Sequence, residues 1–272
     1  MTRIYSLGDK YKITIEKDYG TEPYFDIDDK RKNKNAEYNS KGNLYRARET
    51  VRELALCNEW DWFFTATFSK DKVRDRYDLG GLHSRLAQWL RDMRKSHGWN
   101  VKWLIVPERH KDGAIHFHGL LQGSIPLRDF TSAEDRNGKK RHSGYSTSSE
   151  MLAKFGFNSF GRVRSQEGVA NYITKYITKS FDADNGGRHR YFASLGLLRK
   201  VLRATYYNEP QYSPRSVPAL RDAAIWHWES DFYDCYLASS DEIDEYLLLL
   251  ENTDLNVVDG WVICLRDIEL PF

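Results

Sequence analysis

Hydrophobic and polar positions follow two different periods along the chain, and these periods predict the elements. Apolar residues recur at helical spacing, or nearly so, in three segments that we predict to be helices: residues 44–57, 82–96 and 166–179. Short apolar and aromatic runs predict four strands: residues 62–68, 102–109, 114–121 and 157–164. Asp112-Gly113 lies between the second and third strands and predicts a tight hairpin turn.

The order of these elements predicts an α+β fold. Strands that pair as hairpins form one central antiparallel sheet, and the helices pack on one face of it. Residues 124–150 are polar and lack periodicity, so we expect a long loop there. We expect three regions: a polar N-terminal extension over residues 1–43, a central domain over 44–205, and a C-terminal region with an acidic tail over 206–272.

Composition narrows the class of protein. Of the 272 residues 40% are hydrophobic, which is enough for a core, and no apolar run is long enough to span a membrane. The N-terminus lacks the build of a secretory signal. The three cysteines, Cys57, Cys235 and Cys264, are too far apart for a CxxC metal motif or a disulfide framework. We therefore expect a cytoplasmic protein without membrane contact, in a bacterial host if a phage or plasmid encodes it.

Charge is distributed unevenly along the chain. Residues 222–272 contain thirteen acidic residues and one basic residue, Arg266, for a net charge of −12. The whole chain carries +2, so residues 1–221 carry +14. A basic body of this size suits a nucleic-acid backbone, because binding releases the counterions of the phosphates. Charge alone does not separate this reading from an ordinary basic surface.

A pair of histidines marks the third predicted strand. His116 and His118 flank Phe117, so the period of two places both imidazoles on one face. Glu108 lies across the predicted turn, near Phe117 if residues pair symmetrically about the turn. If its carboxylate reaches the histidine face, two nitrogens and one oxygen converge in a metal site. The alternatives are two ordinary histidines and a surface glutamate paired with Arg109 or Lys111.

The last predicted helix contains a doubled tetrapeptide. Residues 171–179 read NYITKYITK, which places Tyr172 and Tyr176 four residues apart on one helical face. Lys175 and Lys179 form a second row beside them, and Ile173 and Ile177 form a third row toward the core. The alternative is an ordinary amphipathic helix whose tyrosines border the core.

Three motifs in this order resemble the HUH endonuclease superfamily: Thr-rich FTAT at 64–67, HFH at 116–118 and YITKYITK at 172–179. The doubled tyrosine is most similar to rolling-circle initiators of single-stranded DNA phages and their plasmid relatives. The resemblance covers residues 62–179 and implies a sheet of about five strands related to the RNA-recognition-motif topology. The central domain would then be the HUH endonuclease domain. A long basic insertion precedes the third motif.

The resemblance also implies the chemistry. Tyr172 and Tyr176 would attack a phosphodiester in turn through a 5′-phosphotyrosine, with Lys175 and Lys179 favouring the phenolates. Tyr172 is the expected first nucleophile, because both lysines follow it on the helix. Mn²⁺ or Mg²⁺ would bind Glu108, His116 and His118. The expected DNA-binding residues are Thr65, Thr67, Arg162, Arg164, Lys139, Lys140 and Arg141.

The expected partner is single-stranded or origin DNA. The chain has no phosphate-binding loop of the G-x-x-x-x-G-K-[ST] type, so a separate host helicase and polymerase would have to act with it. Three alternatives remain at this point. A relaxase or transposase of the same superfamily uses the same chemistry, and a sequence-specific DNA-binding regulator would need no catalysis. A structural zinc site needs a fourth ligand, for which His110 is the one candidate.

Overall fold

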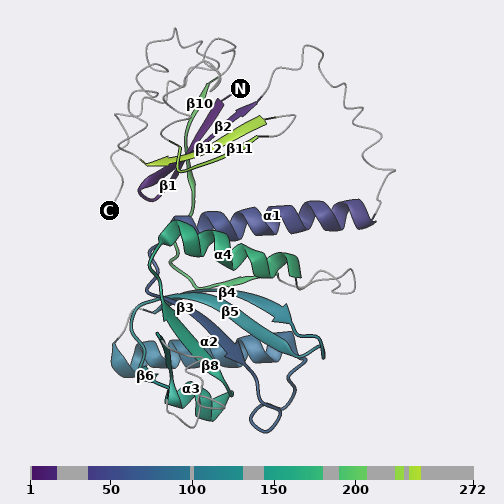
Figure 1. Cartoon of the computed structure of the whole chain (residues 1–272), viewed down its shortest axis with the longest axis vertical. Helices are drawn as coiled ribbons and strands as arrows, with labels where there is room; N and C mark the ends of the chain where they lie inside the picture. Colours follow the sequence, from purple (N-terminus) through teal and green to yellow (C-terminus); the bar gives the residue numbers. More distant parts are fainter. Residues whose placement is uncertain are drawn as a thin grey trace. The chain divides into compact units, whose positions relative to one another are not determined.

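The structure is a computed structural model of the chain, drawn in Figure 1. It describes residues 2–16, 36–98, 101–130, 144–179, 190–206, 224–229 and 233–239. The chain divides into two compact units. One comprises residues 1–31 and 198–272, and the other comprises residues 32–197. The three regions expected from the sequence stay a prediction.

The first unit contains a sheet built from both ends of the chain. In spatial order its strands are β10 (Val201–Tyr206), β1 (Thr2–Leu7), β2 (Lys10–Glu16), β12 (Tyr233–Ser239) and β11 (Trp226–Glu229). All neighbouring strands are antiparallel. Ile4 and Ile13 are paired and fully buried, so the polar N-terminal segment supplies apolar side chains to this sheet.

The second unit contains an antiparallel sheet of seven strands (Figure 1). In spatial order they are β6 (Arg128–Asp129), β7 (Tyr145–Thr147), β8 (Asn158–Arg162), β3 (Trp62–Thr67), β5 (Ile115–Gln122), β4 (Lys102–Arg109) and β9 (Phe192–Ala193). Its four helices are α1 (Ala36–Leu56), α2 (Leu79–His97), α3 (Ser149–Lys154) and α4 (Gln166–Lys179). The predicted α+β class is confirmed.

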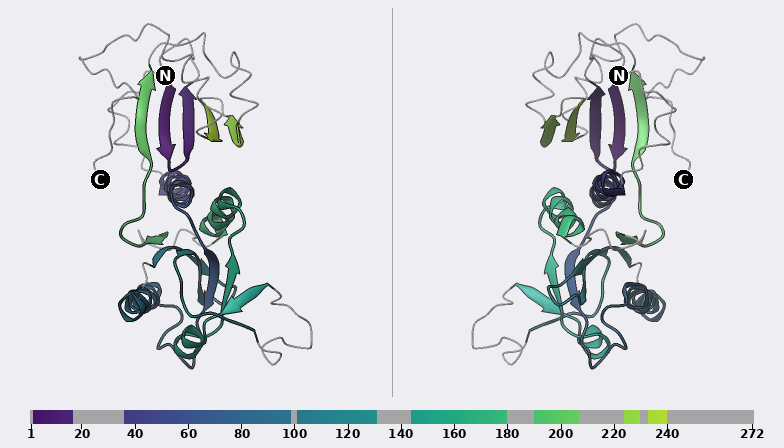
Figure 2. Two further views of the ribbon diagram at one scale, coloured as in Figure 1. Left: turned by 90° about the vertical axis from the view of Figure 1, so that its left-hand side faces the viewer. Right: turned by 90° about the vertical axis from the view of Figure 1, so that its right-hand side faces the viewer.

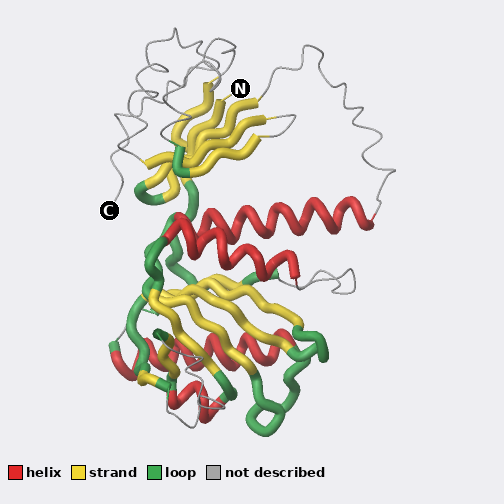
Figure 3. The backbone as a smooth tube through the Cα atoms, in the orientation of Figure 1, coloured by secondary structure: helices red, strands yellow, loops and turns green. Residues whose placement is uncertain are grey.

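The helices lie on both faces of the seven-stranded sheet, with α1 and α4 on one side and α2 and α3 on the other (Figures 2 and 3). From the sequence we expect about five strands and helices on one face only. The three strands beyond the four that the pattern predicts are short: β6 and β9 have two residues each and β7 has three. Runs of this length leave too little alternation to be recognised from sequence.

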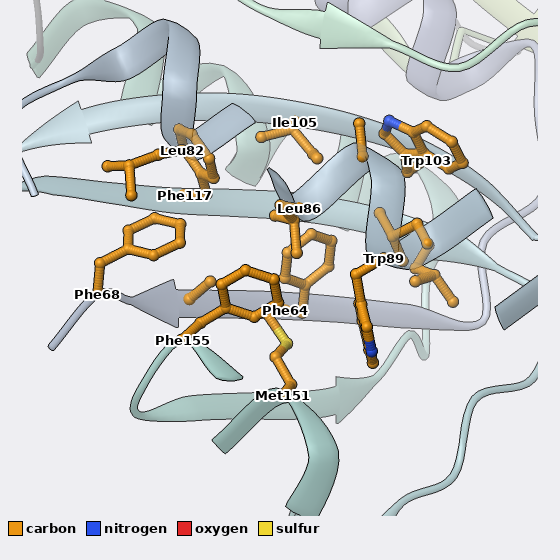
Figure 4. Packing of buried hydrophobic residues seen from close by; sticks show 14 of the residues in the cluster. Phe64, Phe68, Leu82, Leu86, Trp89, Trp103, Ile105, Phe117, Met151 and Phe155 are labelled. Carbon is orange, nitrogen blue, oxygen red and sulfur yellow. The ribbon is translucent and has the colours of Figure 1, made fainter. Parts of the chain in front are cut away.

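One face of this sheet holds the core. Phe64, Phe117 and Phe160 come from three adjacent strands and are buried against α2 and α3 (Figure 4). Helix α2 begins after Asp78, whose carboxylate accepts from the amide of Gly81, and ends at Gly98 in the left-handed conformation. Because side chains alternate along a strand, the residues directly before and after each of these phenylalanines face the side of α1 and α4.

The segment predicted as a loop is structured at both ends. β6, β7 and α3 lie within residues 124–154, and α3 begins after Ser148, which caps it by accepting from the amide of Met151. Residues 131–143 lie outside the described part of the chain. The buried Asn158 explains the local order, because its side chain bonds Thr147 and the backbone of Ser148.

Within the described ranges, no helix has both the length and the apolarity needed to cross a membrane.

Candidate active site

The two histidines lie in the centre of the seven-stranded sheet, on the face toward α4. His118 pairs with Thr65 of β3, and His116 pairs with Thr67 of β3 on one side and Glu108 of β4 on the other. The register therefore places Glu108 opposite His116, one residue from the expected Phe117. The shift follows from the turn, in which the amide of His110 donates to the carbonyl of Ala114. It puts Glu108 on the histidine face.

Each imidazole is held by a threonine of the neighbouring strand. The Nδ1 atom of His118 is 3.2 Å from the Thr65 hydroxyl oxygen, and the Nδ1 atom of His116 is 3.3 Å from that of Thr67. When Nδ1–H donates to the hydroxyl, the lone pair of the imidazole lies on Nε2. The apolar-Thr-apolar-Thr motif thus places a hydroxyl against each histidine, and the DNA-binding role predicted for both threonines stays a prediction.

The remaining imidazole nitrogen of His118 meets a carboxylate. Its Nε2 atom is 2.7 Å from Oε2 of Glu108, and both side chains are largely buried. Burial, with the nearby His110, lowers the pKa of His116. Across the described residues, no three His, Cys, Asp or Glu side chains stand close enough together to hold a metal ion. The structure instead has a His118–Glu108 pair, with His116 two residues along the same strand face.

The two tyrosines lie on the same side of the sheet, because α4 packs against β4 and β5. The ring of Tyr176 stacks on His118 with centroids 3.6 Å apart and is 7% exposed. Tyr172 is 46% exposed. The Tyr176 hydroxyl donates to that of Tyr172 over 2.8 Å. Burial and this hydrogen bond raise the pKa of Tyr176 well above its usual value.

Phe63 of β3 completes this cluster. Its ring centroid is 5.1 Å from that of Tyr172 and 6.1 Å from that of Tyr176. The ammonium of Lys175 lies 5.6 Å from the ring centroid of Tyr172, so its positive charge is next to the exposed phenol. The side chain of Lys179 lies outside the described part of the chain.

Contacts at the start and in the middle of α4 fix its position. The side chain of Gln166 bonds the amide and the carbonyl of Trp60, just before β3. Nε of Arg52 on α1 donates to the side chain of Asn171 over 3.0 Å. Ile173 and Ile177 are fully buried, which confirms the predicted inward row. The helix that holds the tyrosines is thereby tied to the strand that holds the threonines.

Two of the basic residues predicted to bind DNA, Arg162 and Arg164, lie in the described part of the chain. Arg162 lies over the ring of Trp62, on the opposite face of the sheet from the histidines. Arg164 is exposed beyond the end of β8. Lys139, Lys140 and Arg141 lie outside the described residues.

Tyr145, like Phe63, is an aromatic residue on the histidine face that the sequence did not single out. Tyr145 of β7 pairs with Gly161 of β8, and Gly161 pairs with Phe63. Tyr145 is 47% exposed and is one of the groups whose proximity raises the pKa of Tyr176. It follows the polar segment 124–144, where no periodicity signals a strand.

Fold and site together define an α+β protein in which one face of an antiparallel sheet presents two histidines, a glutamate and a pair of tyrosines. Residues 61–181 match the sequence model of a family described as replication-associated protein ORF2. This stretch contains all three motifs and the seven-stranded sheet apart from β9. The match supports a role as a replication initiator.

No curated protein and no solved structure shows significant similarity to the chain.

Proposed function

We propose that the chain is a rolling-circle replication initiator that nicks and rejoins single-stranded DNA through a phosphotyrosine. The observation that carries this proposal is the placement of Tyr172 and Tyr176 over the histidine face. A purely structural tyrosine pair would not need an exposed phenol beside an ammonium, or its partner stacked on His118. The match of residues 61–181 to a replication-associated family supports the same role.

The chemical types of the three donors suit a divalent metal ion, which could bind only if the side chains moved closer together than they stand in this structure. Mn²⁺ binds both imidazole and carboxylate ligands, whereas Mg²⁺ prefers the carboxylate oxygen. If Nδ1–H of each histidine donates to its threonine hydroxyl, Nε2 of both histidines would be the coordinating atom. In this structure Nε2 of His118 lies 2.7 Å from Oε2 of Glu108. When bound, the ion would polarise the scissile phosphate and stabilise its developing charge. Glu108, His116 and His118 would hold it.

Tyr172 is the proposed first nucleophile, because its exposed phenol is open to a phosphate. Its oxygen loses a proton and forms a bond to phosphorus, and the bond between phosphorus and the 3′ oxygen breaks. The freed 3′ oxygen takes up a proton and leaves a 3′-hydroxyl that a polymerase can extend. One phosphoester replaces another, so rejoining needs no ATP. Lys175 stabilises the phenolate.

Tyr176 has a second role before it attacks. Its hydroxyl donates to the oxygen of Tyr172, and this bond strengthens as Tyr172 becomes a phenolate. Once Tyr172 carries the DNA strand, the Tyr176 hydroxyl becomes available for the second attack, which releases Tyr172. Two tyrosines four residues apart can in this way alternate between nicking and joining.

Incubation of the full chain with single-stranded origin DNA and Mn²⁺ tests the function. We expect a covalent adduct on a denaturing gel, mapped by mass spectrometry to Tyr172 or Tyr176. The double Phe variant should form none, whereas Tyr45→Phe, which changes an exposed tyrosine of α1, should react like wild type. An adduct elsewhere would refute the nucleophile, and adduct formation in excess chelator would refute the metal. DNA binding without any adduct would favour a non-catalytic regulator.

A further inference from the structure

Tyr145 lies on the histidine face near the β6 edge of the sheet, on the other side of β3 from β5 and β4, against which α4 packs. The register places Tyr145, Gly161 and Phe63 in one row across β7, β8 and β3. Phe63 in turn contacts both tyrosines of α4. Two strand spacings, about 10 Å, separate the backbones of Tyr145 and Phe63. An exposed aromatic side chain therefore lies on the same surface as the tyrosine pair.

The Tyr145 ring packs against Gly161, which has no side chain. A Cβ atom at Gly161 would lie only 2.9 Å from Cε1 of the Tyr145 ring. The ring therefore packs directly on the glycine backbone, and any other residue at this position would push it away. A ring held in this way presents its remaining surface at a low cost in conformational entropy.

The charge and chemistry of the surroundings favour one kind of ligand. The unit that contains Tyr145, residues 32–197, has 29 basic and 18 acidic residues, a net charge of +11. The tyrosine pair on the same face of the sheet is the proposed attacking group for a phosphodiester. Aromatic side chains that bind single-stranded DNA stack on the faces of its bases, and this contact tolerates any base. A peptide or a lipid would not require a planar side chain next to such nucleophiles.

We propose that Tyr145 is a stacking platform for a base next to the phosphate that the tyrosine pair attacks. This inference rests on the proposed function, because it takes single-stranded DNA as the substrate. The platform holds the flanking nucleotide on the open part of the sheet and so directs the phosphate toward Tyr172. Tyr145 itself contributes binding and positioning and forms no bond to phosphorus.

A cycle of protein and DNA changes tests the platform. Wild type, Tyr145→Leu and Tyr145→Phe are compared for binding to labelled origin single strands by fluorescence anisotropy, in chelator so that no cleavage occurs. Each strand carries one abasic position, scanned along the site. We expect Tyr145→Leu to weaken binding by about 5- to 100-fold and Tyr145→Phe to bind like wild type. At one or two adjacent positions only, removal of the base should lower the affinity of wild type. The same abasic strands should bind Tyr145→Leu no more weakly than the intact strand does.

Two controls separate stacking from structure. Tyr45→Leu removes an exposed tyrosine from α1 and should leave binding unchanged. Gly161→Ala keeps Tyr145 but displaces its ring, so it should reproduce the loss seen with Tyr145→Leu.

An aromatic ring on a glycine also stabilises strand pairing, and this alternative makes a different prediction. If Tyr145 only stabilises strand pairing, Tyr145→Leu lowers the melting temperature. Each abasic position then reduces the affinity of wild type and of Tyr145→Leu by the same factor. That result, or unchanged binding by Tyr145→Leu, would overturn the platform. Because the assay needs no cleavage, loss of the platform and failure of the nicking reaction are distinguishable.

Discussion

Tyr172 and Tyr176 carry the same chemical group in different surroundings. Tyr172 is half-exposed beside an ammonium. Tyr176 is buried against His118, and its hydroxyl donates to the hydroxyl of Tyr172. We expect Tyr172→Phe to abolish the first adduct. Tyr176→Phe should still form it, about ten- to a hundredfold more slowly, because a hydrogen bond to the developing phenolate is lost. It should also fail to rejoin the strand. Single-turnover adduct formation measures both effects.

The reverse outcome would change the order of attack. If Tyr176→Phe loses the first adduct and Tyr172→Phe retains it, the buried phenol attacks first. The exposure of Tyr172 would then serve the second step.

Thr65 and Thr67 provide a second test at this scale. Changing both to Val keeps their branched shape but removes the hydroxyls from the Nδ1 atoms of the histidines. We expect Mn²⁺ affinity, measured by electron paramagnetic resonance or calorimetry, to fall about 10- to 100-fold. The double Ser variant retains the hydroxyls and should bind Mn²⁺ like wild type.

Binding to single-stranded DNA in chelator separates the two roles of these threonines. It should be the same for wild type and the Val variant if the hydroxyls act on the histidines. Loss of DNA affinity with unchanged Mn²⁺ affinity would favour the DNA-binding role that the sequence predicts for both threonines.

At the scale of elements, β5 needs a glycine beside its second histidine. A Cβ atom at Gly119 would collide with the ring of Phe64 and lie 3.1 Å from the carbonyl oxygen of Leu104. We expect Gly119→Ala to lower the free energy of unfolding by about 1–3 kcal/mol, through overpacking of the core. Urea denaturation measures it.

Gly80→Ala is the matched control. Gly80 lies in the first turn of α2, and a Cβ atom there meets nothing closer than 3.7 Å. It should leave stability unchanged or raise it by up to about 1 kcal/mol, because Ala is the better helix former. Equal effects of the two changes would show that the space beside Gly119 is not restrictive.

Local sequence patterns predict the helices and strands of this protein better than they predict which strands pair. The helical spacing around the doubled YITK predicts α4 with the bounds that the structure has, and alternation predicts that His116 and His118 share a face. The pairing of β3 with β5 is different, because it joins residues about fifty positions apart through contacts that no local period encodes. The threonine–histidine hydrogen bonds depend on that pairing, so the sequence could not reveal them. Tyr145 was missed because β7 is three residues long.

At the scale of the whole molecule, the charge asymmetry predicts masking of the basic body by the acidic tail. β11 and β12 lie within residues 222–272, so a truncation at 222 would also remove two strands of the five-stranded sheet. Removal of residues 240–272 spares both strands and deletes nine acidic residues and one basic residue. We expect tighter non-specific binding to single-stranded DNA, with a steeper salt dependence. Titrations at several salt concentrations measure both.

Unchanged or weaker affinity in the shortened, folded protein would reject masking. The melting temperature shows whether the five-stranded sheet has survived the truncation. A full-length variant with the same nine acidic residues changed to Asn or Gln separates the effect of charge from that of length.

The five-stranded sheet places β2 beside β12, although more than two hundred residues separate them in the chain. During synthesis, at roughly 5–20 residues per second, the first hairpin emerges tens of seconds before its last partner strand exists. Residues 32–197 are complete in that interval and contain every residue of the candidate active site that the structure describes. We therefore expect the unit that holds the candidate site, residues 32–197, to fold on the ribosome first, while one edge of β2 is still unpaired. A nascent chain stalled before β12 should contain a protease-resistant unit over residues 32–197 and a protease-sensitive N-terminal hairpin.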